Sequence, residues 1–499
     1  MGELPLLAGG LLDGDERSRY EAMRQSPVTV LQIGEGNFLR GFFDWMIYEC
    51  RKQGVYDGSI AVTQPRASGK AKLDAIKRQD GLYTLVVRGL ENGEQVNRSE
   101  RVAVFSEAID PYGEWPRFLA LAELPSLQFV VSNTTEAGLA YAAEPYAPGE
   151  PVKSFPGKLT ALLYKRYEHF GGAPDKGLNM LPCELLERNG DELKRCVLQF
   201  TADWRLPDDF VRWVEGSCRF LNGLVDRIVP GHPGEEAAGE LLSELGYADP
   251  LLNTAEPYYI WAIEAEAEMD EKLPLRKAGL NVHWVDDLKP YQLRKVRILN
   301  GAHTLMTPLG ILNGLESVRE VMEHPAIGAF VTETVEREII PAVPLERGEL
   351  ERYARQTYDR FRNPYLHHRL ADISMNSLSK FKARLLPTLE SYAGLNGAVP
   401  PRLSRALAGL VRLYKVKRTE QGFTGNDLHG GSYAVRDDAD ALASFEAAWA
   451  SYERDGGTLA DTAAALLGNA ALWGKDLTRI GGLLDAVTEY LTEMERLQR

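Results

Sequence analysis

Two glycines that follow an apolar run are the first candidates for a binding function. Residues 30–40 read VLQIGEGNFLR, in which Gly34 and Gly36 separate a buried-strand pattern from a helical one. In a strand–turn–helix, Gly-x-Gly lets the backbone approach a ligand closely, and the helix N-terminus attracts an anion. The stretch therefore predicts a cradle for the pyrophosphate of a dinucleotide. A plain tight turn explains the same glycines, because Leu39 occupies the third glycine position of G-x-G-x-x-G.

The end of the next expected strand bears on which nucleotide would bind. Residues 62–69 read VTQPRASG and contain no acidic residue that would hold a ribose 2′-hydroxyl. Arg66 can instead meet a 2′-phosphate, so both NAD and NADP stay open. A glycine turn also serves S-adenosylmethionine in methyltransferases, but of their Asn-Pro-Pro-Tyr motif only Asn363-Pro364-Tyr365 is found, far along the chain. We rank a methyltransferase below a dehydrogenase and keep a non-enzymatic nucleotide sensor as a third class.

Three polar side chains in the C-terminal half form the second candidate site. Lys295, Asn300 and His303 lie within KVRILNGAHTLM (295–306), a stretch that is otherwise largely apolar. On an α-helix with about 100° per residue, Asn300 and His303 are about 60° apart and Lys295 is about 80° from His303, so the three can face one cleft. Buried polar groups need partners, which favours a functional role. The alternative is a solvated basic face that Lys295 shares with Arg294 and Arg297.

Other spacings argue against several classes of enzyme. Tyr291-x-x-x-Lys295 matches the Tyr/Lys pair of short-chain dehydrogenases, but it lies too far from the glycine turn and lacks the upstream serine. The eight histidines show no metal-ligand spacing, the pair His367-His368 is expected on a surface, and we expect no metal. Four scattered cysteines without a CxxC spacing are expected to be reduced packing residues; they are Cys50, Cys183, Cys196 and Cys218.

Composition indicates a globular, acidic protein without general affinity for nucleic acid or anionic membranes. The chain has 499 residues, too many for one core, so two or three domains are expected. Its net charge of −14 argues against nucleic acid and anionic membranes as partners, although a local basic pocket can still bind an anionic small substrate. Neither a secretory signal nor an apolar run of the roughly 18–20 residues that span a bilayer is present. A cytoplasmic location is therefore expected.

The pattern of elements must position these candidate residues. Strands are expected at 27–33, 59–64, 82–88, 101–105, 127–133 and 177–184, with a helix over 38–53 and a hairpin at Asn92-Gly93. Such alternation predicts an α/β, Rossmann-like doubly wound sheet in residues 1–280. Long amphipathic patterns such as 313–339 and 402–417, and a tail divided by Gly481-Gly482, predict a mostly α-helical C-terminal domain in residues 281–499.

These motifs together resemble those of the mannitol dehydrogenase family, the long-chain polyol dehydrogenases. The resemblance covers nearly the whole chain and rests on G-x-G-x-F-x-R from Gly34 to Arg40, V-D-R-I-x-P over residues 225–230, and K-x-x-x-x-N-x-x-H from Lys295 to His303. Polyol enzymes tend to have Cys-Asp-Asn where this chain has Cys183-Glu184-Leu185. The asparagine that contacts a polyol there is Leu185 here, which argues against mannitol and fits the branch of the family that acts on uronates.

The resemblance implies a zinc-independent reaction with a lysine acid/base. Lys295 would move the proton, while Asn300 and His303 would hydrogen-bond the reacting oxygen or its neighbour. The implied activity is NAD-dependent hydride transfer that interconverts D-tagaturonate and D-altronate. Reduction of fructuronate to mannonate and oxidation of a polyol such as mannitol are its rivals in the same class, and the oligomeric state stays open.

The substrate of such an enzyme carries a carboxylate that a cation must hold. The helical half offers Arg369, Lys380 and Arg384, and the resemblance favours Lys380. Asp226 and Arg227 are further candidates for substrate contacts, with a buried structural ion pair as the alternative.

Contacts to the cofactor are implied at two turns of the N-terminal domain. The implied residues are Gly34, Gly36, Asn37, Phe38 and Arg40 at the phosphates, and Asn133, Thr134 and Glu136 at the nicotinamide ribose. Two of these assignments have a structural alternative: Phe38 can pack in the core, and Glu136 can be a charge that stabilises a helix N-terminus.

Overall fold

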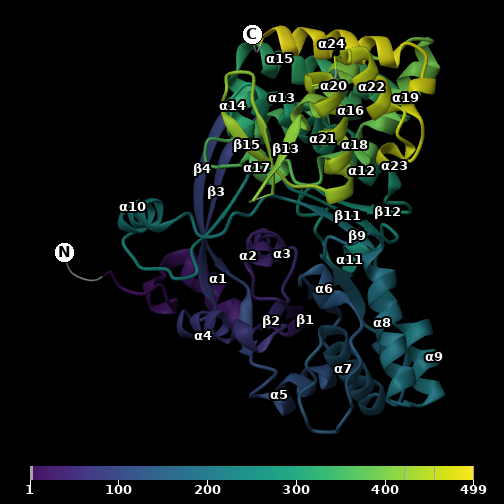
Figure 1. Ribbon diagram of the computed structural model, residues 1–499. Coiled ribbons are helices and arrows are strands. Elements are labelled where there is room, and N and C mark those ends of the chain that lie inside the picture. Colours follow the sequence, from purple (N-terminus) through teal and green to yellow (C-terminus); the bar gives the residue numbers. More distant parts are fainter. Residues whose placement is uncertain (1–3, 421, 455, 498–499) are drawn as a thin grey trace. The chain divides into compact units, whose positions relative to one another are not determined.

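The computed structural model describes residues 4–420, 422–454 and 456–497, apart from the side chain of Glu136 (Figure 1). It divides into two compact units. Unit 1 comprises Met1–Arg88 and Val96–Leu288, and unit 2 comprises Gly89–Gln95 and Lys289–Arg499. The domain boundary that we expected after residue 280 therefore falls within the last segment of unit 1.

A six-stranded parallel sheet forms the centre of unit 1. Its strand order is β5-β2-β1-β6-β7-β8, which in order of appearance along the chain is 3-2-1-4-5-6. This order confirms the predicted doubly wound, Rossmann-like fold. The winding reverses between β1 and β6, so a crevice opens at the carboxyl ends of these strands. The strands are β1 (Val28–Ile33), β2 (Ser59–Thr63), β5 (Phe105–Ile109), β6 (Phe129–Ser132), β7 (Asn179–Pro182) and β8 (Arg219–Phe220).

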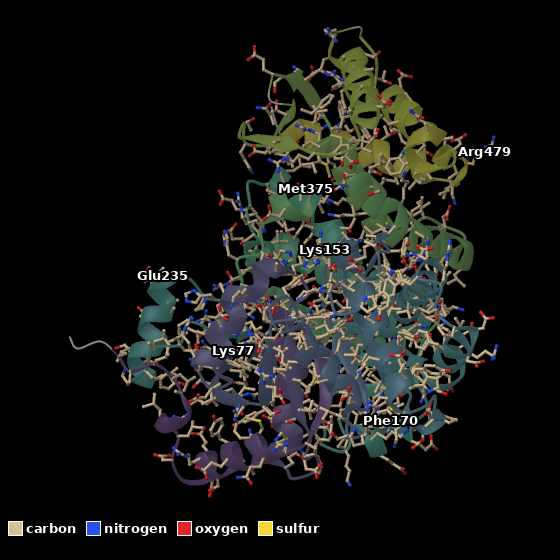
Figure 2. All side chains as sticks on the ribbon, turned by 90° about the horizontal axis from the view of Figure 1, so that it is seen from below. Lys77, Lys153, Phe170, Glu235, Met375 and Arg479 are labelled. Atoms are coloured by element: carbon tan, nitrogen blue, oxygen red, sulfur yellow. The ribbon has the colours of Figure 1, made fainter. Side chains whose placement is uncertain are left out.

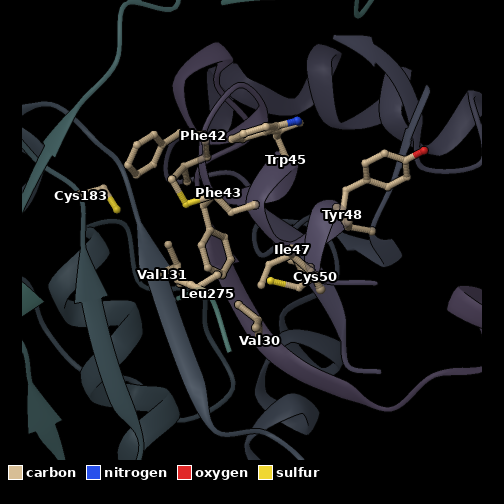
Figure 3. Close-up of a cluster of buried hydrophobic side chains, with 14 of the residues drawn as sticks. Val30, Phe42, Phe43, Trp45, Ile47, Tyr48, Cys50, Val131, Cys183 and Leu275 are labelled. Atoms are coloured by element: carbon tan, nitrogen blue, oxygen red, sulfur yellow. The ribbon is translucent and has the colours of Figure 1, made fainter. Parts of the chain in front are cut away.

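Helices pack against both faces of the sheet through apolar side chains. All residues of β1 are buried, as expected for a central parallel strand. Figure 3 shows Phe43, Ile47 and Cys50 of α3 (Phe43–Lys52) gathered with Val30 of β1 and Val131 of β6. The helices of unit 1 are α1 (Gly14–Gln25), α2 (Asn37–Arg40), α3, α4 (Lys70–Arg78), α5 (Trp115–Ala120), α6 (Glu136–Leu139), α7 (Phe155–His169), α8 (Asn189–Asp203), α9 (Asp208–Ser217), α10 (Glu235–Leu245) and α11 (Met269–Lys272).

The segment expected to be helical over 38–53 is helical but divided, so only its continuity was wrong. The chain forms α2 and then α3, with Phe42 in a non-helical conformation at φ −134° and ψ −85°. The interruption brings the backbone of Gly41 against Val229. A Cβ atom at Gly41 would lie 2.7 Å from Val229 Cγ1, so only glycine allows this approach.

The hairpin at Asn92-Gly93 is present. Asn92 and Gly93 have φ of +54° and +80°, the left-handed values that a tight hairpin turn requires. The turn joins β3 (Leu82–Glu91) to β4 (Glu94–Ala103), so the strand expected at 101–105 is the end of β4, and the parallel strand β5 after it was missed. The remaining strands of unit 1 are β9 (Gly223–Asp226), β10 (Asn253–Ala255), β11 (Ile260–Glu264) and β12 (Val282–Val285).

Unit 2 is mostly helical, as predicted, and is centred on α13 (Gly301–Leu312). This helix is buried on nearly every side and packs against α14, α15, α17, α18 and α20. The helices of unit 2 include α12 (Lys289–Arg294), α14 (Val318–Glu323), α15 (Pro325–Thr334), α16 (Arg347–Phe361), α17 (Leu370–Ile373), α18 (Ser377–Arg384), α19 (Leu386–Asn396), α20 (Pro401–Leu413), α21 (Ala439–Arg454), α22 (Leu459–Leu467), α23 (Ala470–Trp473) and α24 (Leu483–Leu497).

Two expectations for unit 2 need correction. The pattern over 313–339 is divided into α14, α15 and a π-helical segment, Val335–Ile339, because His324 and Pro325 end one helix and begin the next. The pattern over 402–417 ends early, and β13 (Val416–Thr419), β14 (Gly422–Asn426) and β15 (Ser432–Val435) then form an antiparallel sheet that was not predicted.

The surface of both units carries charged side chains, among them Lys77 and Glu235 of unit 1 and Arg479 of unit 2 (Figure 2). Of the helices within the described part of the chain, none has the length and apolarity to cross a membrane.

Candidate functional site

A cavity of about 760 Å³ opens in unit 1 where β1, β2 and β6 end. These are the carboxyl ends on either side of the point where the strand order reverses, the usual position of a nucleotide in such folds. The cavity is lined by Gly34, Glu35 and Gly36 after β1, by residues 65, 66, 68 and 69 after β2, by 71, 72, 75 and 78 on α4, by 133–135 after β6, and by 250 and 251.

The glycine turn is shaped for close approach to a ligand. Gly34 has φ of +135°, and a Cβ atom there would lie 2.9 Å from the carbonyl oxygen of Asn133. At Gly36 a Cβ atom would meet nothing within 4 Å, so its backbone borders open space in the cavity. The side-chain amide of Gln32 on β1 stabilises the turn by donating a hydrogen bond to Gly34 O at 2.9 Å. Bare backbone facing a cavity at this position fits the pyrophosphate of a dinucleotide.

The turn after β6 is fixed by a buried carboxylate. Glu184 accepts hydrogen bonds from the backbone N–H of Thr134 at 2.8 Å and from the hydroxyls of Thr134 and Ser132, both at 3.1 Å. Asn133 donates to Cys183 O at 2.8 Å. Asn133 and Thr134 thus line the cavity in a defined conformation. Glu136 begins α6, but its side chain lies outside the part that the structure describes.

Three other residues that we assigned to the cofactor make contacts with protein groups. Arg40 is buried and donates to Leu251 O and, at 2.8 Å, to Asn37 Oδ1. Its guanidinium also lies 5.3 Å from the ring centroid of Tyr83. Phe38 stacks on Phe42 with ring centroids 5.0 Å apart, which is the core-packing alternative. These residues support the turn from behind, and a direct contact of theirs with a cofactor stays a prediction.

The second motif of the family supports the break between α2 and α3. Arg227 is buried and donates to Gly41 O at 2.7 Å and to Glu256 O at 2.9 Å. The guanidinium lies 4.5 Å from the centroid of the Trp45 ring, and burial lowers its pKa to about 10. With Val229 against Gly41, the VDRIVP stretch fixes the break between α2 and α3. Asp226 is buried beside it, and a role in substrate binding stays a prediction for both residues.

The candidate catalytic residues of unit 2 lie on one helical rod that is not α-helical throughout. Lys295–Asn300 form a π-helix, which continues directly into α13 with His303. In a π-helix, hydrogen bonds join residues five apart, so Lys295 and Asn300 lie one turn apart on the same face, and His303 follows on the next turn. The three residues therefore align more closely than the arc that we derived for an α-helix. π-Helical turns occur frequently at functional sites.

The alternative of a solvated basic face does not hold for the neighbouring arginines. Arg294 is buried, pairs with Glu349, and lies 4.6 Å from the ring centroid of Tyr353. Arg297 donates to the carbonyls of residues 383 and 384 at 2.9 and 3.0 Å, at the C-terminus of α18, where a cation is favoured. Lys295 itself is half-buried.

The surroundings of His303 correct the expectation for the histidine pair. His367 is exposed, but His368 is half-buried and packs edge-on against His303, with ring centroids 4.8 Å apart. Phe361 covers His303 with a centroid distance of 4.4 Å. Burial lowers the pKa of His368. Sequence reasoning missed His368, because residues 65 positions apart carry no local signal of this contact.

The cations on α18 differ in their contacts. Arg384 donates to Thr304 Oγ1 at 3.2 Å, and this hydroxyl in turn donates to Asn300 O at 2.8 Å. Lys380 donates to Ile373 O at 2.7 Å. Burial lowers the pKa of both side chains. Arg384 is thus tied to the turn that carries Asn300. Among the described residues, no group of three or more His, Cys, Asp or Glu side chains is placed to hold a metal.

The same elements and motifs occur in known proteins. The profile described as the mannitol dehydrogenase Rossmann domain matches residues 28–277, and that of the mannitol dehydrogenase C-terminal domain matches residues 287–495. The altronate oxidoreductase of Bacillus subtilis (strain 168) is 41% identical over 478 residues, which cover 96% of this chain and 95% of the relative. That of Klebsiella pneumoniae (strain 342) is 42% identical over 468 residues, or 94% of each protein.

Two solved structures share the fold at low identity. Pseudomonas fluorescens mannitol 2-dehydrogenase, in a ternary complex with NAD and D-mannitol, matches with a TM-score of 0.62 and 21% identity over 95% of this chain and 93% of that one. D-Sorbitol dehydrogenase in substrate-free form matches with a TM-score of 0.76 and 21% identity over 95% of both chains. From the two domain profiles and the relatives that are 41–42% identical, we conclude that the chain belongs to the mannitol dehydrogenase family of oxidoreductases.

Proposed function

We propose that the protein is an NAD-dependent oxidoreductase that interconverts D-tagaturonate and D-altronate. The observation that carries this proposal is the identity of 41–42% with altronate oxidoreductases over more than nine-tenths of the chain. Leu185, in place of the asparagine of polyol enzymes, is 70% exposed in the loop after β7, and its side chain offers no hydrogen bond to a polyol. The backbone cradle at Gly34–Gly36 supports the dinucleotide part of the proposal.

The reaction divides its tasks among a few groups. A nicotinamide, when bound, supplies or accepts the hydride. Lys295 Nζ gives a proton to the substrate oxygen as the ketone is reduced and takes one from the hydroxyl in the reverse direction. Asn300 and His303, aligned with Lys295 along the rod, orient that oxygen and stabilise the negative charge that develops on it. No metal is required for these steps.

A uronate needs a cation for its carboxylate, and we assign this task to α18. Lys380 is the residue that the family resemblance favours. Arg384 is a second candidate, since its bond to Thr304 holds it at the turn of Asn300. A guanidinium can bind a carboxylate through two parallel hydrogen bonds, which an ammonium cannot do.

The test follows the loss of NADH absorbance with tagaturonate, fructuronate and fructose as parallel substrates. Wild type, Lys295→Ala and the control Lys289→Ala are compared; Lys289 is an exposed residue of α12. We expect wild type and the control to oxidise NADH with tagaturonate as substrate. In Lys295→Ala the rate of NADH oxidation should be about 10²–10⁴-fold lower. Preference for fructuronate or fructose would overturn the assignment of tagaturonate as substrate. Full activity in Lys295→Ala would overturn the assignment of Lys295 as acid/base.

Inactivity on all three substrates would reopen the other classes. Thermal stabilisation by NADH, NADPH or S-adenosylmethionine then separates a dehydrogenase from a methyltransferase, because each ligand stabilises only the protein that binds it.

A further inference from the structure

The cavity of unit 1 contains an unexpected combination of charges. Three cations line it, Arg66 after β2 and Lys72 and Arg78 on α4. Glu35, the middle residue of the glycine turn, is the one carboxylate among the lining residues. The cations alone would favour a phosphate, so the position of Glu35 decides what the cavity accepts.

Glu35 reaches from its own turn to the loop after β2. A Cβ atom on Gly69 would lie 2.5 Å from Glu35 Oε1, and 2.7 Å from the Cβ of Gln64. Gly69 has φ of −73°, a value that any residue adopts. Glycine is therefore needed at position 69 for space, because the carboxylate of Glu35 packs against the backbone there.

The loop after β2 is where a dinucleotide-binding fold normally places an acidic residue for the ribose hydroxyls. This chain has none in that loop. Gln64 is buried and donates to Asp110 Oδ1 at 2.7 Å, so its amide is engaged away from the cavity. Arg66 donates to Thr135 Oγ1 at 2.9 Å and is held toward the turn after β6. Glu35 supplies a carboxylate at the missing position from the neighbouring strand.

We propose that Glu35 selects NAD(H) over NADP(H), by accepting hydrogen bonds from the adenosine ribose hydroxyls and repelling a 2′-phosphate. The proposal rests on the proposed function in one respect, that the cavity binds a nicotinamide dinucleotide. Burial raises the pKa of Glu35, and the charges of Lys72 and Arg40 oppose this shift. Repulsion of a 2′-phosphate requires the ionised carboxylate, which these cations favour.

Loss of that charge should reverse the preference. In Glu35→Gln, Arg66, Lys72 and Arg78 remain and would attract a 2′-phosphate. We expect the ratio of the Kd for NADPH to the Kd for NADH to fall by about two orders of magnitude, because juxtaposed like charges are strongly unfavourable. Gly69→Ala should act independently: it keeps the charge but displaces the carboxylate, and should weaken NADH binding about tenfold.

The experiment is equilibrium binding of NADH and NADPH without substrate, by calorimetry, to wild type, Glu35→Gln, Gly69→Ala and the control Glu215→Gln. Glu215 is an exposed carboxylate of α9, outside the lining of the cavity. Tighter binding of NADH to wild type and control, with the ratio shifted in Glu35→Gln, is the expected result. An unchanged ratio in both cavity variants, or a wild type that prefers NADPH, would overturn the proposal.

Binding separates this proposal from the proposed function. If wild type binds NADH but does not reduce tagaturonate, the substrate is wrong and the role of Glu35 is still tested by the two Kd values. If wild type binds neither dinucleotide, both proposals are overturned. Should Glu35→Gln not fold, Gly69→Ala alone decides the role of Glu35, with unchanged NADH affinity as the contradicting outcome.

Discussion

His303 and His368 lie edge to face in unit 2, with ring centroids 4.8 Å apart and an interplanar angle of 78°. His303 belongs to the rod that carries Lys295, and His368 precedes α17. Burial lowers the pKa of His368, Arg360 contributes in the same direction, and Asp372 opposes them. Burial therefore favours a neutral His368 beside His303.

A neutral His368 predicts an acid limb in the pH profile. As the pH falls through its lowered pKa, His368 gains a charge next to His303, and kcat/KM should fall. In His368→Asn we expect this limb to disappear and kcat/KM at neutral pH to decrease about tenfold, the cost of roughly one aromatic ring contact. The measurement is kcat/KM from pH 5 to 8. His367→Asn, at the exposed neighbour, is the control, and an identical acid limb in both variants would refute the assignment.

The cations of α18 should act on charged substrates only. Lys380→Met and Arg384→Met are each expected to raise KM for a uronate about 10–100-fold, the loss of one charge-assisted hydrogen bond or a bidentate pair. Turnover of uncharged fructose, where measurable, should change little. Lys382→Met is the control, because residues two apart on a helix do not share a face. Equal losses on fructose and on the uronate would mean that these variants disturb the fold rather than the carboxylate.

Asp44 should make stability depend on pH. It is fully buried below the glycine turn, where Gln32 donates to its Oδ2 at 3.2 Å, and burial raises its pKa from 3.8 to about 7. The folded state thus binds a proton that the unfolded state has already lost, so the free energy of unfolding falls as the pH rises from about 4 to about 7. Each pKa unit corresponds to about 1.4 kcal/mol.

Asp44→Asn removes this loss and should be more stable than wild type at pH 8. We expect its advantage to be roughly 2–3 kcal/mol smaller at pH 5 than at pH 8, given the two pKa values and linkage. Urea unfolding of both proteins at the two pH values measures the difference. An advantage that does not change with pH would show that Asp44 is ionised in the folded protein.

Gly41 and Val229 should be energetically coupled. Gly41→Ala places a methyl group 2.7 Å from Val229 Cγ1 and should destabilise the protein by about 1–3 kcal/mol, the usual cost of overpacking. Val229→Ala in the same chain should restore most of the loss, and urea unfolding of the double-mutant cycle measures this coupling. Gly239→Ala on α10, where a Cβ atom meets nothing within 4 Å, should not destabilise. Additive losses at 41 and 229 would refute the contact.

The sequence predicts the fold best where the pattern of apolar residues is strong. The buried strands 28–33, 59–63 and 129–132 were recognised because they are short, apolar and β-branched. β5 was missed because only its first and last residues are buried, and β13–β15 because glycines and polar residues hide their alternation. Pro325 was a local signal that should have divided the pattern over 313–339.

The members of the candidate site stay predictions, and their geometry could not be derived from the sequence. The spacing of Lys295, Asn300 and His303 indicated one helix, but the apolar pattern of this segment is the same for a π-helical turn as for an α-helical one. Arg227 was assigned to substrate, and its recorded hydrogen bonds are to Gly41 O, at the break between α2 and α3, and to Glu256 O. His368 contacts His303, and Glu35 lies beside Gly69, across long separations in the sequence. Local periodicity gives no information about such contacts.

The π-helical turn from Lys295 to Asn300 makes the alignment of the rod depend on its winding as well as on residue identity. A π-turn accommodates one residue more than an α-turn, so a deletion of one residue within it would allow ordinary α-helical pairing without breaking the helix. Everything before the deletion would then keep nearly its present phase relative to His303, because the residue that is lost is the one that the wider turn accommodates. If the turn instead became α-helical with its length unchanged, Lys295 would rotate to about 80° from His303 and the three side chains would lose their alignment. In this segment, a change in the phase of the helix would be as damaging as replacement of the lysine.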